Sequence, residues 1–430
     1  MKTVSWFVAC ALAGGTVMGI AAAAVAQPAL SSHSGPFGPS SSSGNLAAPG
    51  VSLREAFDAA WQRAVQSREV EVQALRARAD RISAASLSPA VPAFEASHLD
   101  DRANSSAGRR ESEIGIVWPL WLPGQRDARI AAADADLRFA DLGVDAARLR
   151  IAGAVRESAW KLASAKAEID ASEMQQRYLR GVADDVQRRV DAGDLARADA
   201  LAARAELMEA EAGGREAARQ LQALQIHWRA LTGLVAMAVV AMPTAASDLA
   251  MPMGGDHPEL RVAIQAVERA RRRIEVVNRS RRDPPELSVK YRQEAPGLGA
   301  GTQRGIGVGI RIPFGTDGRN APLQAAAIGD LDIADTSEQR LRDRLDADLL
   351  TARSAVENGV RQLETTRARA ALLRERAQLI DLSFRAGETP LPELLRASNA
   401  AAQADAAFAR QQAALGLAHA QLQQASGHLP

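Results

Sequence analysis

The chain has 430 residues, a formal net charge of +1 and one cysteine, Cys10. Because arginines alternate with glutamates and aspartates along helical stretches, the composition argues against a nucleic-acid partner, which would need a clustered basic surface. After the N-terminal region no apolar run reaches about 18 residues, so the sequence predicts no transmembrane helix and any membrane crossing would use β-strands.

The first 26 residues have the features of a cleavable signal peptide. Lys2 supplies the positive charge, Val4–Ala24 are apolar or small, and Ala24–Ala26 form an A-x-A cleavage site. Cleavage would remove Cys10, so we expect neither a disulfide nor a cysteine-ligated metal in the mature chain. Lipidation of Cys10 is the less favoured alternative, because the apolar run before it is short. Residues 27–50 are rich in Ser, Gly and Pro, which predicts a flexible linker.

Residues 51–240 form a first predicted repeat. Apolar periodicity predicts a helix over 53–87, strands near 94–100 and 113–120, a long helix over 125–190 and a return helix over 195–231. The second strand is marked by Ile114, Ile116 and Trp118 at every other position. Leu142, Leu149, Val155, Leu162 and Ile169 are separated by six or seven residues, which is typical of a coiled-coil seam.

A predicted linker over 241–256 leads to a second repeat over 257–426. Its predicted elements are a helix over 257–282, strands near 286–294 and 304–312, a long helix over 322–384 and a return helix over 391–424. Ile306, Val308, Ile310 and Ile312 alternate with Gly305, Gly307, Gly309 and Arg311. This alternation is the clearest strand pattern in the chain.

The two repeats share landmarks at one offset of 194 residues. Pro119-Leu120 corresponds to Pro313-Phe314, Gly124 to Gly318, and Ala192-Gly193 to Ala386-Gly387. An offset this long indicates a duplicated half of domain size rather than a solenoid repeat.

The four predicted strands have the length needed to cross a bilayer when tilted. Ile114, Ile116, Trp118, Ile306, Val308, Ile310 and Ile312 would face lipid, whereas Ser288, Lys290, Arg292 and Arg311 would face a wet lumen. Trp118 and Tyr291 are candidates for the interfacial aromatic belt. Four strands cannot close a barrel, but three copies would supply twelve. A soluble β-cap on a coiled coil is the alternative, and the pattern alone leaves both open.

The order and spacing of these landmarks resemble the TolC-type outer membrane factors, the exit ducts of Gram-negative tripartite efflux pumps. The resemblance covers about 51–426. It rests on the twofold repeat, on both Pro-to-Gly turns, on the His257–Leu260 helix opening, and on Ala192–Leu195 with Asp199 and Ala386–Thr389 with Glu393. Within the family the chain looks most similar to the cation-efflux branch, which includes CzcC- and CusC-like proteins.

The resemblance implies a mainly helical homotrimer. Duplicated long-helix hairpins would form a trimeric α-barrel that reaches into the periplasm, and four strands per chain would complete a 12-stranded transmembrane β-barrel in outer membrane lipid. A periplasmic adaptor and an inner-membrane transporter would be its partners. Substrates, including heavy-metal cations, would pass through passively.

The resemblance also assigns candidate site residues. Gly193, Asp194, Leu195, Gly387, Glu388 and Thr389 would form the periplasmic tip that docks partners. Family members often close this end with a carboxylate ring, and Glu393 and Asp199 are the candidates for such a constriction. Arg396 stands where some members have a second acid, which puts the form of the ring in doubt. The alternative is that Glu393 is an ordinary solvated residue in a first helical turn.

No pattern in the chain predicts an enzyme, a cofactor or a metal site. Gly305–Gly309 leads into a strand rather than a helix, so it does not predict a phosphate loop. The six histidines lack metal-ligand spacing, and His98 beside Asp100 is better interpreted as part of a solvated loop. A periplasmic adaptor and a soluble coiled-coil scaffold remain as alternatives; an adaptor would have one hairpin rather than two.

Overall fold

The structure is a computed structural model that describes residues 50–101, 108–240, 256–297, 299–314 and 317–430, all within one compact unit, Ala48–Pro430. The predicted signal peptide and nearly all of both predicted linkers lie outside the described residues. The elements are α1 (Leu53–Arg63), α2 (Val65–Ala84), β1 (Ala93–Asp100), β2 (Arg110–Pro119), α3 (Gln125–Ala192), α4 (Arg197–Thr232), α5 (Pro258–Arg279), β3 (Glu286–Ala295), β4 (Gln303–Arg311), α6 (Asp317–Arg385) and α7 (Leu391–Ala425).

Two helices, α3 and α6, are far longer than the rest. They contain 68 and 69 residues, so each extends about 100 Å. Alanine and arginine, which are strong helix formers, are the most frequent residues of α3, and alanine, leucine and arginine are the most frequent residues of α6. A glycine follows each of them closely, and there the chain reverses into α4 or α7.

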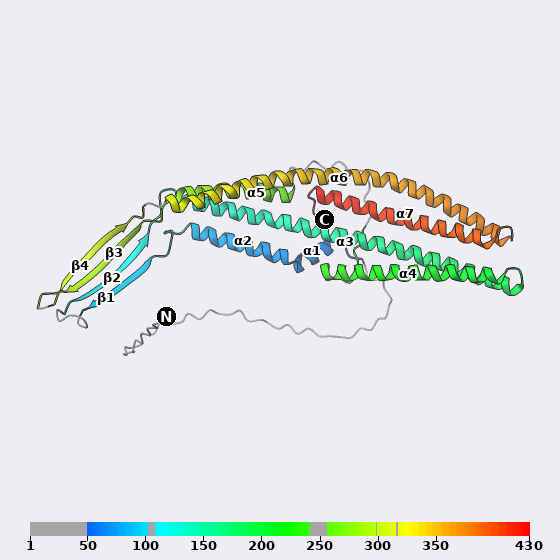
Figure 1. Cartoon of the computed structure of the whole chain (residues 1–430), viewed down its shortest axis with the longest axis horizontal. Helices are drawn as coiled ribbons and strands as arrows, with labels where there is room; N and C mark the ends of the chain where they lie inside the picture. Colours follow the sequence, from blue (N-terminus) through cyan, green and yellow to red (C-terminus); the bar gives the residue numbers. More distant parts are fainter. Residues whose placement is uncertain (1–49, 102–107, 241–255, 298, 315–316) are drawn as a thin grey trace, which may run out of the picture. The chain divides into compact units, whose positions relative to one another are not determined.

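The long helices pack side by side with their neighbours (Figure 1). Helix α3 contacts α2, α4, α5 and α7, and α6 contacts α5 and α7. Many buried residues along α3 and α7 are alanines, whose small side chains allow close approach of the helices. At Gly416 a Cβ atom would lie 2.1 Å from the Trp160 ring, so the indole occupies the space that a side chain there would need.

Both halves of the chain end in the same order of two strands, long helix, turn and return helix, but the first half opens with two helices, α1 and α2, and the second with one, α5. The four strands form one antiparallel sheet in the order β1-β2-β3-β4. The observed strands begin and end within about three residues of the predicted positions. The fold is therefore mainly helical with a small antiparallel sheet, as predicted.

Two helix boundaries differ from the predictions. The predicted helix over 53–87 is divided at Ala64, whose extended backbone separates α1 from α2. Alanine is a strong helix former, so packing rather than propensity causes this break: Phe57 of α1 packs with Trp228 of α4, whereas Ala74 of α2 packs with Ala140 of α3. The second long helix begins at Asp317, before the predicted start at Pro322, and Pro322 lies within its first turns.

Candidate functional site

The sheet has one apolar face. Because residues paired across antiparallel strands share a face, the register places Phe94, Ile116, Val289 and Val308 in one row, and Ala96, Ile114, Tyr291 and Ile306 in the next; Trp118, Leu287 and Ile310 form a third row. Ile306 is 77% exposed and Trp118 is 40% exposed. No element of the described chain covers this face, so its large side chains lack an apolar environment within the chain.

The opposite face carries charges that pair across the strands. The Lys290 ammonium lies 2.9 Å from Glu113 and 3.3 Å from Glu95. Arg292 bonds Glu111 at 2.8 Å, and Arg311 bonds Glu286 at 3.3 Å. These ion pairs link all four strands on this face, as the predicted assignment of Lys290, Arg292 and Arg311 to one face requires.

Glycines make room for these charged side chains. A Cβ atom at Gly115 would lie 2.8 Å from Cγ of Lys290, so the lysine crosses over β2 to reach Glu95 on β1. At Gly305 and Gly307 a Cβ atom would meet nothing within 4 Å. Within one chain, therefore, no neighbouring atom crowds these two positions of β4.

The helical turns are the other predicted site. Gly193 and Gly387 have φ values of +88° and +82°, the left-handed conformation that glycine adopts without strain. The amide of Asp194 donates to the carbonyl of Arg189, and that of Glu388 to the carbonyl of Ser383. Each turn thus satisfies terminal carbonyls of its own long helix. The predicted tip residues lie where the sequence placed them, and partner docking there stays a prediction.

A link between the two turns was not predicted. The guanidinium of Arg189, at the end of α3, donates to the carbonyls of Phe384 and Arg385 at the end of α6. It also lies over the Phe384 ring, 5.0 Å from its centroid. A basic residue near a helix C-terminus is a recognisable signal, but the sequence does not show that its acceptors belong to a second helix.

Glu393 is paired with two arginines. It accepts from Arg376 of α6 at 2.7 Å and from Arg396 of its own helix at 3.1 Å. Asp199 bonds the amide of Ala196 at the start of α4, which is a capping contact. Constriction of a pore by either carboxylate stays a prediction, and the two arginines beside Glu393 mean that a ring built from this residue would carry both charges.

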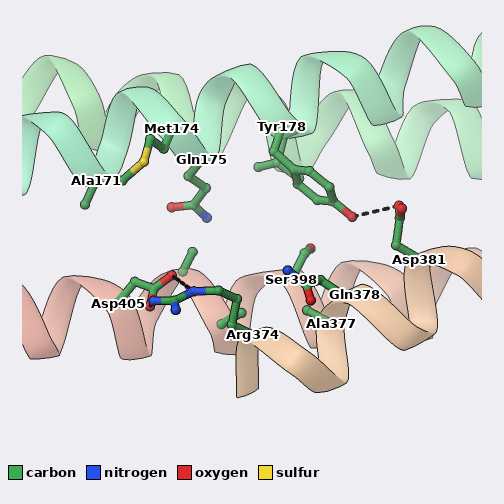
Figure 2. A pocket seen from close by; sticks show the side chains of 13 residues that line it. Ala171, Met174, Gln175, Tyr178, Arg374, Ala377, Gln378, Asp381, Ser398 and Asp405 are labelled. Atoms are coloured by element: carbon green, nitrogen blue, oxygen red, sulfur yellow. Dashed lines mark hydrogen bonds and ion pairs between the residues drawn. The ribbon is translucent and has the colours of Figure 1, made fainter. Parts of the chain in front are cut away.

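A cavity of about 250 Å³ lies between α3, α6 and α7, near the turns. Figure 2 shows Tyr178 and Asp381 at one end and Arg374 and Asp405 toward the other, with Gln175, Ser398 and Ala377 between them; Ala401 and Ala402 also line the cavity. Tyr178 donates to Asp381 at 3.2 Å. Burial and the Asp381 charge raise the pKa of Tyr178, which keeps its hydroxyl a hydrogen-bond donor. The cavity therefore has walls of mixed polarity between its polar ends.

Two of the described histidines have structural roles. His257 caps α5, and its Nδ1 accepts from the amide of Glu259, as expected for a residue that enters a helix. His98 lies in β1 and bonds Ser112 at 3.0 Å, so its predicted place in a solvated loop was wrong. In the described part of the chain, acidic, histidine and cysteine side chains form no group of three that could hold a metal. Among the described helices, none is long and apolar enough to span a membrane.

Comparisons with known proteins agree with this geometry. A family model described as outer membrane efflux protein matches residues 59–234. VceC, an outer membrane protein of Vibrio cholerae, has 15% identity and a TM-score of 0.72, over 87% of this chain and 96% of its own. The Campylobacter jejuni outer membrane channel CmeC has 15% identity and a TM-score of 0.70, over 87% of this chain and 85% of its own.

A third similar structure is CusC, with 15% identity and a TM-score of 0.72 over 88% of this chain and 93% of its own. Since VceC is equally similar, these values do not favour the cation-efflux branch. No curated protein sequence matches the chain. At these identities the structures establish the fold, and the family model adds agreement in sequence over the first repeat.

Proposed function

The chain belongs with the TolC-type outer membrane factors, and from this membership we propose that it is the passive exit duct of a tripartite efflux pump. The observation that carries the proposal is the two-faced sheet, with an exposed apolar face on one side and paired charges on the other. Such a sheet fits a wall between lipid and water. The energy for export would come from an inner-membrane transporter.

The open edges of the sheet support a trimer. Strands β1 and β4 each pair on one side only within the described sheet, and unpaired strand edges are not tolerated in lipid. Joining β4 of one copy to β1 of the next removes both edges. Three copies give twelve strands, an even number within the range of known outer membrane barrels.

The helices offer a second contact between copies. Leu201 and Met208 of α4 and Leu372 and Leu379 of α6 are more than half exposed and are each spaced by seven residues. Helix α4 contacts α3, α3 contacts α7, and α7 contacts α6, so α4 and α6 lie at the two sides of this layer (Figure 1). Packing α4 of one copy against α6 of the next would bury these exposed residues of both helices and close an α-barrel.

The first experiment is membrane fractionation of the full-length chain, followed by light scattering of the detergent extract. An outer membrane trimer supports the duct. A soluble periplasmic monomer or dimer would overturn it and favour a coiled-coil scaffold.

The turns around Gly193 and Gly387 would dock the adaptor and the transporter. Opening would separate the hairpin ends in an iris-like movement. Glu393 would contribute to a ring of mixed charge rather than of carboxylates alone, because Arg376 and Arg396 accompany it. Asp199 would hold the start of α4 beside this ring.

Channel recordings of Glu393→Ala test the gate. Without the carboxylate, Arg376 and Arg396 would leave the ring positive, so we expect a higher closed-state conductance and a shift of ion preference toward anions. Glu375→Ala, which removes an exposed carboxylate of α6, is the matched control. Unchanged single-channel behaviour of Glu393→Ala would reject the gate role and leave the duct proposal standing.

We also propose heavy-metal cations as cargo. The support is the sequence resemblance to the cation-efflux branch and a small excess of acidic over basic residues on the charged strand face. The acidic residues there are Glu95, Glu111, Glu113, Glu286 and Glu294, and they meet Lys290, Arg292, Arg311 and, just before β2, Arg109. Expression in a strain that lacks its own channel should restore metal tolerance more than dye tolerance. The opposite order would reject the cation assignment.

A further inference from the structure

Hydrogen bonds join the four segments that connect the helices to the strands. The indole of Trp121 donates to the Ser86 carbonyl at 3.2 Å, and Arg126 donates to the Ala85 carbonyl at 2.6 Å. Gln125 donates to Ser280 at 3.1 Å. Asn320 bonds the Arg281 carbonyl. These bonds make one local unit, which we name the junction. It consists of the connections from α2 to β1, from β2 to α3, from α5 to β3 and from β4 to α6.

The junction exposes large apolar side chains. Phe314 is 90% exposed, Val91 is 87% exposed and Leu87 is 84% exposed. All three lie just outside the strand ends. From Ile306 of β4 the exposed apolar stretch continues to Phe314, which is about 26 Å of extended chain. At a strand tilt of about 40° this length rises about 20 Å, which is most of the height of a barrel's apolar band of about 25 Å.

The junction is also basic. Across 84–92, 119–130, 279–286 and 311–314 the chain carries six arginines and three carboxylates. We name Arg126, Arg129, Arg279 and Arg282 the basic collar. Arg126 donates to neutral carbonyls, Arg129 lies over the Trp121 ring at 5.2 Å, and the Arg279 side chain runs along Gly124. Arg126, Arg279 and Arg282 are exposed.

Apolar side chains that adjoin an arginine-rich, tryptophan-containing rim fit the boundary between acyl chains and phosphate headgroups. We propose that the basic collar binds the phosphates of anionic lipid headgroups and fixes the depth of the protein in the bilayer. This inference rests on the proposed function, since it requires the apolar sheet face to lie in a membrane.

The test compares thermal unfolding of the detergent-solubilised full chain with and without added phosphatidylglycerol. We expect the lipid to raise the unfolding midpoint of the wild type, and Arg279→Gln with Arg282→Gln to remove about half of that rise or more. Arg340→Gln with Arg369→Gln, which removes two exposed arginines of α6 outside the junction, is the control and should keep the full rise. An undiminished rise in the collar variant overturns the proposal.

Two further measurements separate lipid from other ligands. Inorganic phosphate at the same concentration should leave the midpoint unchanged; an equal rise would mean a free-phosphate site. Because Cys10 is the one cysteine of the chain, Cys10→Ser permits a dye on Phe314→Cys, which headgroup-labelled quencher lipids should quench in vesicles. If the protein is still trimeric and membrane-bound but the dye is not quenched, another copy covers Phe314. That result would overturn the proposal that the junction contacts lipid, and it would leave the duct proposal standing.

Discussion

The sheet and the helical turns, at opposite ends of the long helices, differ in how they are stabilised. At the turns Leu179, Val186, Phe384 and Leu394 are nearly fully buried in a cluster contributed by all four long hairpin helices. In the sheet the large apolar residues are exposed, and hydrogen bonds and ion pairs between strands provide the contacts. The turns therefore have their own hydrophobic core, whereas the sheet needs an apolar environment from outside the chain.

This difference indicates what each end does. Exposed apolar patches of this kind mark surfaces that meet a membrane or a partner, which is why the sheet carries the duct proposal. A buried cluster beside glycine turns gives hairpin ends that keep their shape without neighbours. Because all four helices contribute to this cluster, the two hairpins share a core at this end, and Arg189 adds polar contacts between them at the end of α6.

Deleting a side chain from the core at the turns should have the largest effect. Leu394→Ala removes a fully buried residue and should lower the free energy of unfolding of this region by about 2–5 kcal/mol. Hydrogen exchange of residues 179–203 should accelerate strongly, while that of the strands stays unchanged. Leu382→Ala, an exposed leucine of α6, is the control. Equal acceleration in the strands would show that the two ends are not independent.

A charge on the apolar sheet face should have a slightly smaller effect, confined to the other end. Val308→Arg should cost about 2–4 kcal/mol if Val308 reaches the bilayer midplane and should reduce the trimer in the outer membrane fraction. Gly307→Ser places a polar side chain on the opposite face, where there is open space, and should leave the trimer intact. Normal accumulation of Val308→Arg would contradict a lipid-facing surface.

The sequence predicted the sheet end better than the contacts between helices. Alternating residues such as Ile306 and Val308 determine a strand and its two faces locally, and the pairing in the structure agrees with them. The break at Ala64 and the bonds from Arg189 to α6 depend on residues more than 100 positions away in the chain. Neither composition nor spacing contains that information, so these features required the structure.

Removing the Arg189 contact should loosen the connection between the hairpins without unfolding either. Two long hydrogen bonds to the end of α6, a cation–π contact and the ion pair with Asp185 would be lost. Because these contacts lie near the surface, where water screens them, the total is about 1–3 kcal/mol. We expect Arg189→Ala to increase the closed-state conductance of the reconstituted channel. Arg188→Ala, the exposed neighbour that pairs with Asp185, should behave as the wild type. If both variants conduct alike, Arg189 does not restrain opening.

The smallest expected effect concerns the start of α5, between the two ends. Burial lowers the pKa of His257, although the Glu259 charge and a bond to the Gln424 backbone act to raise it. The unfolded chain therefore takes up a proton at a higher pH than the folded chain does, so stability falls as pH drops below the ordinary histidine pKa of about 6.5.

An asparagine at position 257 would keep the helix cap but would not titrate. Between pH 7.5 and 5.5, His257→Asn should lose about one or two degrees less of its unfolding temperature than the wild type. His227→Asn, at an exposed site of α4, should lose as much as the wild type; if His257→Asn does too, the buried histidine does not contribute to acid sensitivity.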